Sequence, residues 1–151
     1  MRAVETGIDI AGPPWRVWRV LTDLAAYPAW NPVVTRAEGL AEAGARLRVR
    51  VELPGRSAVH LEPTVVAVET GRRFRCRCRP LRLPGLLDGE HEYEVERLAE
   101  GRAARLRHRV RLSGLLAPLA GLGGLADAIR RALEAVDAAV KARVERPRGE
   151  T

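Results

Sequence analysis

The fold is decided by residues 115–144, LLAPLAGLGGLADAIRRALEAVDAAVKARV, in which hydrophobicity follows the helical period. Apolar residues recur there every three or four positions, and charged residues fill the positions between them. The apolar positions are Leu115, Leu119, Leu122, Ala126, Ile129, Leu133, Val136, Val140 and Val144. The charged positions, which extend one residue further, are Asp127, Arg130, Arg131, Glu134, Asp137, Lys141, Arg143 and Glu145. A helix of about 45 Å with one apolar face needs a broad, concave partner.

Glycines interrupt the first third of this predicted helix, at Gly121, Gly123 and Gly124. Each glycine weakens a helix interior by up to about 1 kcal/mol relative to alanine. Two interpretations follow from this. Either the helix is broken or irregular at the glycines, or a continuous helix is kept thin there and leaves room beside it.

The rest of the chain predicts mainly strands. Residues 46–53 give the clearest one, because leucine or valine alternates there with arginine or glutamate. Residues 15–21 and 24–30 predict two short helices after the first strand, and Pro63 predicts an irregularity within a strand. The other predicted strands are residues 4–10, 33–38, 57–68, 73–79, 87–96 and 104–112.

These elements predict a single α+β domain over residues 1–145, followed by a flexible tail at residues 146–151. A curved, seven-stranded antiparallel sheet with one apolar face would cover the long C-terminal helix. Acidic residues alternate along residues 88–96, and arginines alternate along residues 105–111. We expect these two rows on neighbouring strands, where cross-strand ion pairs help to set the register.

Composition narrows the range of partners. The net charge is +7, but Lys141 is the only lysine, and the arginines alternate singly with apolar residues. Aromatic residues make up only 4%, so no stacking surface for bases is visible and nucleic-acid binding is not predicted. No run of residues predicts membrane insertion or secretion, so we expect a cytoplasmic protein. Cys76 and Cys78 are expected to be reduced thiols.

Polar side chains gather on the inward face of the later strands, at Cys76, Cys78, His91, Tyr93 and His108. A tight turn near residues 99–101 places His108 opposite either His91 or Tyr93, and a loop centred near residue 83 would bring Cys76 close to His91. These residues fit a core with local hydrogen bonds, a ligand-orienting group, or acid–base catalysis. A zinc site has suitable ligand types but no compact spacing, so neither metal nor cofactor is predicted.

Several segments resemble the START-related superfamily (SRPBCC), in particular its bacterial polyketide cyclase/dehydrase-like branch. They are Ile8-Asp9-Ile10, Trp15-Arg16-Val17-Trp18, Tyr27-Pro28-Ala29-Trp30-Asn31-Pro32, residues 89–93 and residues 113–118. The resemblance implies a helix-grip fold, in which a seven-stranded sheet wraps around the final helix and encloses a cavity. It also implies that Cys76 occupies a position where a bulky aromatic is common.

The expected function is therefore to bind a small hydrophobic, lipid- or polyketide-like molecule in that cavity, as a monomer or homodimer. Residues 83–87 and the segment around Trp30 would form its mouth. One alternative is a polyketide aromatase/cyclase in which His91, Tyr93 or His108 moves protons, although the sequence favours a non-enzyme. Another is a protein-interaction module that uses the 83–87 loop. The expected ligand-binding residues are Trp30, Val49, Val51, Phe74, Cys76, His91, Tyr93, His108, Val110, Leu119, Leu122 and Ile129.

Overall fold

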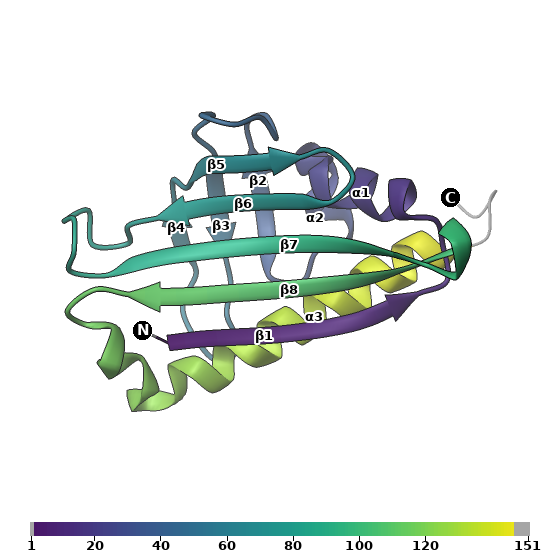
Figure 1. Ribbon diagram of the computed structural model, residues 1–151. Helices are drawn as coiled ribbons and strands as arrows, with labels where there is room; N and C mark the ends of the chain where they lie inside the picture. Colours follow the sequence, from purple (N-terminus) through teal and green to yellow (C-terminus); the bar gives the residue numbers. More distant parts are fainter. Residues whose placement is uncertain (1, 147–151) are drawn as a thin grey trace.

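A computed structural model describes residues 2–146, apart from the side chains of residues 120–123. Strands and helices are both present, and the longest helix follows the last strand (Figure 1). The N-terminal half comprises β1 (Arg2–Ile10), α1 (Pro14–Thr22), η1 (Leu24–Ala26), α2 (Tyr27–Trp30), β2 (Val34–Glu38), β3 (Arg48–Val51), β4 (Val59–Leu61) and β5 (Thr64–Glu69). The C-terminal half comprises β6 (Arg73–Cys78), β7 (Asp88–Leu98), η2 (Ala99–Gly101), β8 (Ala103–Ser113), η3 (Ala117–Gly124) and α3 (Leu125–Glu145).

The strands form two antiparallel sheets, which differs from the single sheet of seven strands predicted above. One sheet has the order β1-β8-β7-β6-β5, and the other has the order β2-β3-β4. The eighth strand arises at Pro63, which has no N–H to donate to a ladder and separates β4 from β5. The sheets still meet there, because the Leu47 N–H donates to the Pro63 carbonyl at 2.8 Å. The predicted α+β class and the long C-terminal helix are confirmed, and the arrangement is consistent with a helix-grip fold.

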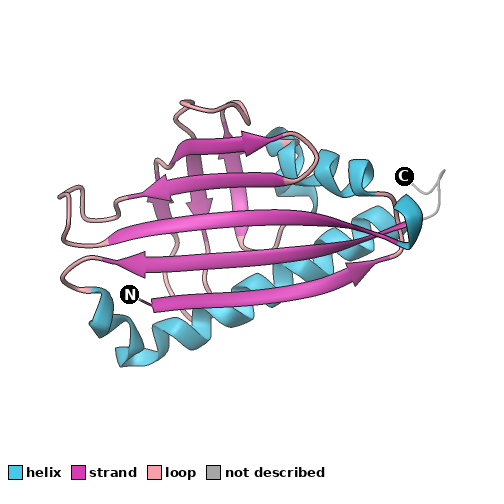
Figure 2. Cartoon of the chain, viewed as in Figure 1, coloured by secondary structure: helices cyan, strands magenta, loops and turns pink. Residues whose placement is uncertain are grey.

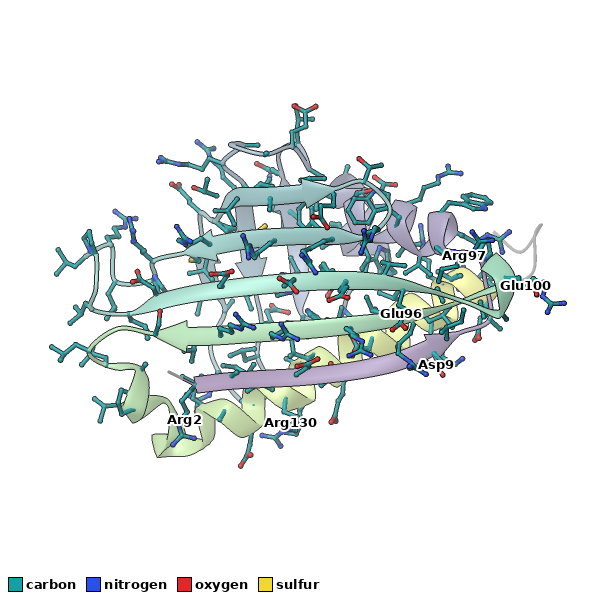
Figure 3. All side chains as sticks on the ribbon, viewed as in Figure 1. Arg2, Asp9, Glu96, Arg97, Glu100 and Arg130 are labelled. Atoms are coloured by element: carbon teal, nitrogen blue, oxygen red, sulfur yellow. The ribbon has the colours of Figure 1, made fainter. Side chains whose placement is uncertain are left out.

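The acidic row of β7 lies beside the arginine row of β8, as the alternation predicted, and a second row of arginines on β6 lies on its other side. Glu92 is opposite Arg75 of β6 on one side and Arg109 of β8 on the other. The ladder continues into β1, where Asp9 accepts a hydrogen bond from Arg105 Nε at 2.7 Å. Figure 3 shows acidic and basic side chains over the face of the sheet turned away from α3, among them the labelled Asp9 and Glu96. Exposed pairs of this kind each contribute at most about 1 kcal/mol, so their main effect is on register.

Helix α3 covers the opposite face of the five-stranded sheet (Figures 1 and 2). It begins at Leu125 and has 21 residues, about 31 Å, so the predicted long helix is broken at its glycines. Gly124, at its N-terminal end, has a φ of +72°, a backbone conformation that favours glycine. Leu115, predicted on the helical stripe, is 78% exposed.

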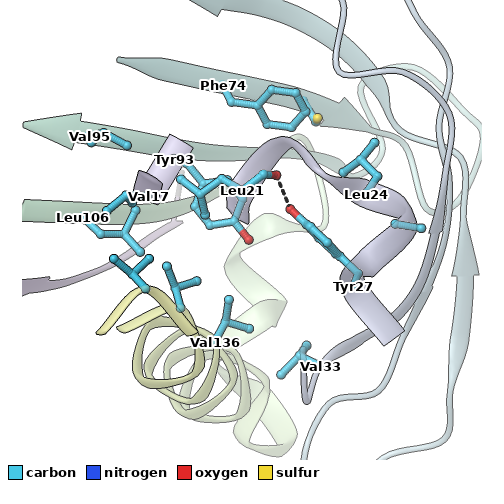
Figure 4. Close-up of a cluster of buried hydrophobic side chains, with 14 of the residues drawn as sticks. Val17, Leu21, Leu24, Tyr27, Val33, Phe74, Tyr93, Val95, Leu106 and Val136 are labelled. Carbon is cyan, nitrogen blue, oxygen red and sulfur yellow. Dashed lines mark hydrogen bonds between the residues drawn. The ribbon is translucent and has the colours of Figure 1, made fainter. Parts of the chain in front are cut away.

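Side chains of α1 lie within the hydrophobic core (Figure 4). Val17 and Leu21 are fully buried, and the Tyr27 hydroxyl donates to the Leu21 carbonyl oxygen at 2.6 Å. Asn31 ends α2 by accepting hydrogen bonds from the backbone N–H groups of Val33 and Val34. Of the predicted tail, residues 146–151, all but Arg146 lie outside the described residues.

Candidate functional site

A cavity of about 260 Å³ lies between the two sheets and helix α3. Its wall is mostly apolar, with Val49 and Val51 of β3 on one side and Ile129, Ala132 and Leu133 of α3 on another. The inward-facing side chains of β6, β7 and β8 complete it. An apolar cavity of about 150 Å³ is enough to hold a benzene molecule, so this one has room for a small organic ligand.

Eight of the twelve predicted ligand-binding residues border this cavity. They are Val49, Val51, Cys76, His91, Tyr93, His108, Val110 and Ile129. Their role in binding remains a prediction, but the structure brings them together from five elements, β3, β6, β7, β8 and α3.

The other four predicted residues do not border the cavity, or cannot be placed. Phe74 is 2% exposed and packs in the hydrophobic core, and Trp30 packs against that core from its edge. Leu119 is 53% exposed, because α3 begins only at Leu125 and its buried face does not extend so far back. The side chain of Leu122 lies outside the described residues. The predicted mouth at residues 83–87 does not border the cavity either, and Leu83 is 60% exposed.

The register of the sheet places the polar residues of the cavity wall. Tyr93 lies directly opposite His108, and Cys76 lies directly opposite His91. The His91 ring stands edge-on to the other two rings, with centroids 4.6 Å from Tyr93 and 4.7 Å from His108. The three rings therefore form one cluster on the inner face of β7 and β8.

A chain of hydrogen bonds runs from this cluster into helix α3. His91 Nε2 lies 2.6 Å from His108 Nε2, and His108 Nδ1 lies 2.9 Å from Asp137 Oδ1. The Thr6 hydroxyl donates to Asp137 Oδ2 at 2.5 Å. A carboxylate only accepts hydrogen bonds, so His108 Nδ1 carries a proton. A neutral His108 then accepts at Nε2 from His91 Nε2–H, and His91 Nδ1 is left as an acceptor.

Asp137 is a correction to the sequence analysis, which placed it on the charged face of the helix. It is 2% exposed, and its two oxygens accept the hydrogen bonds from His108 and Thr6. Burying a carboxylate is costly unless it is hydrogen-bonded, and these two bonds offset that cost. The sequence spacing indicates the buried position of Asp137. This residue follows Leu133 by four positions and precedes Val140 by three, so it lies within the apolar stripe of the helix. Thr6 and Tyr27, which borders the cavity, were also missed.

Burial keeps three groups on the cavity wall, His91, Tyr93 and Cys76, uncharged. It lowers the pKa of His91 well below its usual value, and the charge of a protonated His108 would lower it further. Burial also raises the pKa of Tyr93 well above its usual value and raises that of Cys76 to about 12. Near neutral pH the wall thus presents a neutral imidazole, a phenol and a thiol.

A family model described as polyketide cyclase / dehydrase and lipid transport matches residues 1–145. The chain belongs to this family. The resemblance noted in the sequence is therefore confirmed over nearly the whole chain. No curated protein matches this family member.

Solved structures share the fold of this polyketide cyclase / dehydrase and lipid transport family member at low sequence identity. A START superfamily protein from Mycobacterium smegmatis has a TM-score of 0.74 at 19% identity, covering 95% of this chain and 97% of its own. The Zhui aromatase/cyclase from Streptomyces sp. R1128 has a TM-score of 0.64 at 21% identity, covering 99% of each chain. A major latex-like protein from Panax ginseng has a TM-score of 0.76 at 10% identity, covering 96% and 98%. Such identities show a common fold and leave the ligand open.

In the part of the chain that the structure describes, no three His, Cys, Asp or Glu side chains gather in a way that could hold a metal ion. No helix among the described residues is long and apolar enough to cross a membrane.

Proposed function

We propose that this family member binds one small, mostly apolar molecule in the cavity between its sheets and helix α3. The observation that carries the proposal is the cavity itself, about 260 Å³ in volume and walled by side chains such as Val51, Val110 and Ile129. Ligand pockets of drug-sized molecules begin at about 300 Å³, so we expect a compact ligand such as a fused two-ring aromatic or a medium-length acyl chain.

His91 supplies the hydrogen-bonding group for that molecule. Its Nε2 is engaged by His108, which leaves Nδ1 as an acceptor in a mostly apolar wall. A hydroxyl group on the ligand would donate to Nδ1, and one well-placed polar contact in an apolar pocket sets the orientation of a ligand. Because the pKa of His91 is lowered, this acceptor stays unprotonated near neutral pH.

Binding of naphthalene and naphthol tests this proposal, because the two probes differ by one hydroxyl group. We expect saturable binding of both by fluorescence titration, with naphthol bound more tightly by a factor of about ten, the value of one good hydrogen bond of about 1.4 kcal/mol. His91→Phe should remove the preference for naphthol and keep naphthalene binding. The control Trp15→Phe changes an exposed aromatic residue on α1 that does not border the cavity, and it should alter neither. Absence of saturable binding of either probe would overturn the proposal.

A second candidate function, proton transfer of the aromatase/cyclase type, is favoured by the hydrogen bond from His108 to Asp137. A carboxylate that accepts a hydrogen bond from Nδ1–H orients an imidazole ring and stabilises its protonated form. His91 could then take a proton from a ligand at Nδ1 and release its Nε2 proton to His108, which would become an imidazolium beside the Asp137 carboxylate. The Zhui aromatase/cyclase has the same fold, which is compatible with this chemistry.

Product profiles test the second candidate. A purified polyketide synthase that releases linear poly-β-ketones would be incubated with the wild type and with His91→Gln and His108→Gln. If the protein catalyses cyclisation, we expect ring products to form faster with the wild type than with either variant. Identical products and rates with and without the protein would overturn this candidate and leave ligand binding unaffected.

A further inference from the structure

A second hollow, a groove of about 900 Å³, lies on the outer surface where β3 and β4 approach β6. Seven arginines and two glutamates line it, together with His60. We name it the arginine groove. Such an excess of positive charge in a concave surface concentrates the electrostatic field and attracts anions.

Four of the seven arginines are already paired with carboxylates. Arg36 pairs with Glu38, Arg77 with Glu90, Arg79 with Asp88 at 3.1 Å, and Arg50 with Glu52. Within residues 2–146, the remaining three have no carboxylate within ion-pair distance. These three are Arg46, Arg48 and Arg82, and all are exposed to solvent.

The arginine groove and the apolar cavity meet. Val49, Leu61, Cys78 and Pro80 line both of them. The two hollows meet where the two sheets separate. Pro63 divides β4 from β5, so β4 is an edge strand of one sheet and β5 is an edge strand of the other. A molecule lying across this junction would have an apolar wall at one end and arginines at the other.

From this juxtaposition we infer that the ligand is an anionic amphiphile. Its apolar part occupies the cavity, and its carboxylate or phosphate group lies in the arginine groove against Arg46 and Arg48. This inference rests on the proposed function and adds the chemical class of the ligand. Guanidinium groups suit the role, because their planar, forked donors match the oxygens of a carboxylate or a phosphate.

A pair of probes with the same chain and different ends tests the inference. Decanoate and decanol would be titrated by calorimetry into the wild type, into Arg46→Gln/Arg48→Gln, and into the control Arg131→Gln/Arg143→Gln. The control removes the same charge from the exposed face of α3. We expect the wild type and the control to bind decanoate at least about tenfold more tightly than decanol at low ionic strength. The preference should shrink as salt is added and disappear in the groove variant.

The outcomes separate this inference from the proposed function. Equal binding of decanoate and decanol by the wild type would overturn the inference and keep the cavity as a binding site. A preference for decanoate over decanol that remains in the Arg46→Gln/Arg48→Gln variant would also overturn the inference. Failure of both decyl probes to bind would overturn the inference, whereas the proposed function falls only if naphthalene and naphthol also fail to bind. Inorganic phosphate is the third probe, and we expect it to bind far more weakly than decanoate. Phosphate binding as tight as that of decanoate would show a site for free anions and overturn the assignment to an amphiphile.

Discussion

His108 Nδ1 on strand β8 lies 2.9 Å from Asp137 Oδ1 on helix α3, and both side chains are almost completely buried. This contact joins the sheet to the helix at the wall of the cavity. It also fixes the orientation of the His108 ring, which in turn holds His91 through the contact between their Nε2 atoms. One buried carboxylate therefore organises the polar end of an otherwise apolar site.

Replacing Asp137 with alanine should destabilise the protein by about 1–3 kcal/mol, because the His108 Nδ1–H and the Thr6 hydroxyl would lose their acceptor. Urea denaturation monitored by circular dichroism measures this change. Glu134→Ala is the matched control, since Glu134 is exposed on the same helix, and its effect should stay within about 0.5 kcal/mol. Equal effects of the two substitutions would contradict a structural role for the buried carboxylate.

The lowered pKa of His91 predicts that acid weakens the fold. Between the folded-state pKa and the ordinary value of about 6.5, the unfolded chain binds a proton that the folded protein does not, so stability falls as the pH falls. The loss from one such group is at most about 1.4 kcal/mol per pH unit, and it is absent above pH ~7. Unfolding free energies at a series of pH values should show a smaller acid loss for His91→Gln. The control His60→Gln should follow the wild-type profile, and parallel profiles for all three proteins would argue against the burial of His91.

Filling the cavity should abolish ligand binding without destabilising the protein. Ala132 borders the cavity, so Ala132→Leu places its added carbons in that space. Ala128 is also buried on α3 but does not border the cavity, so Ala128→Leu should cost about 1–3 kcal/mol through overpacking. Thermal unfolding and probe titration distinguish the two variants. A similar loss of stability in both would show that the cavity cannot accept a larger side chain.

The two thiols should react slowly and unequally with alkylating reagents. Cys76 is buried with a pKa of about 12, whereas Cys78 is half-buried, and its pKa is also raised by burial. Since the thiolate is the reactive form, iodoacetamide at pH ~8 should modify Cys78 first and Cys76 last. Mass spectrometry of Cys76→Ala and Cys78→Ala resolves the two rates. A bound ligand should slow the reaction of Cys78, which borders the cavity, and unchanged rates would contradict binding there.

Much of the fold could be predicted because it depends on local patterns in the sequence. Alternation placed β3, β6, β7 and β8, and the acidic and arginine rows of β7 and β8 lie opposite each other as expected. The error in strand number came from Pro63, whose missing N–H was recognised as an irregularity but not as the boundary between two sheets. The glycines before α3 left two interpretations, and the structure shows a break at Gly124.

The candidate site was predictable only in part. The alternation of side chains along each strand placed His91, Tyr93 and His108 on one face. It did not determine which residue lies opposite His108, because a one-residue change in a turn shifts the whole register. Asp137 was assigned to solvent because it is charged, although its spacing put it within the apolar stripe. A buried charge depends on a partner distant in sequence, here His108, and such partners appear only in the folded chain.

The sequence by itself determined the α+β class, the buried and exposed faces of β6, β7 and β8, and the family to which the chain belongs. These properties depend on neighbours a few residues apart, through side-chain periodicity, proline and glycine. The tertiary structure alone decided that Asp137 reaches His108, that a cavity remains beside them, and that the cavity meets the arginine groove at Cys78 and Pro80. Each of these depends on how strands and helices far apart in the chain pack together, which local patterns do not specify.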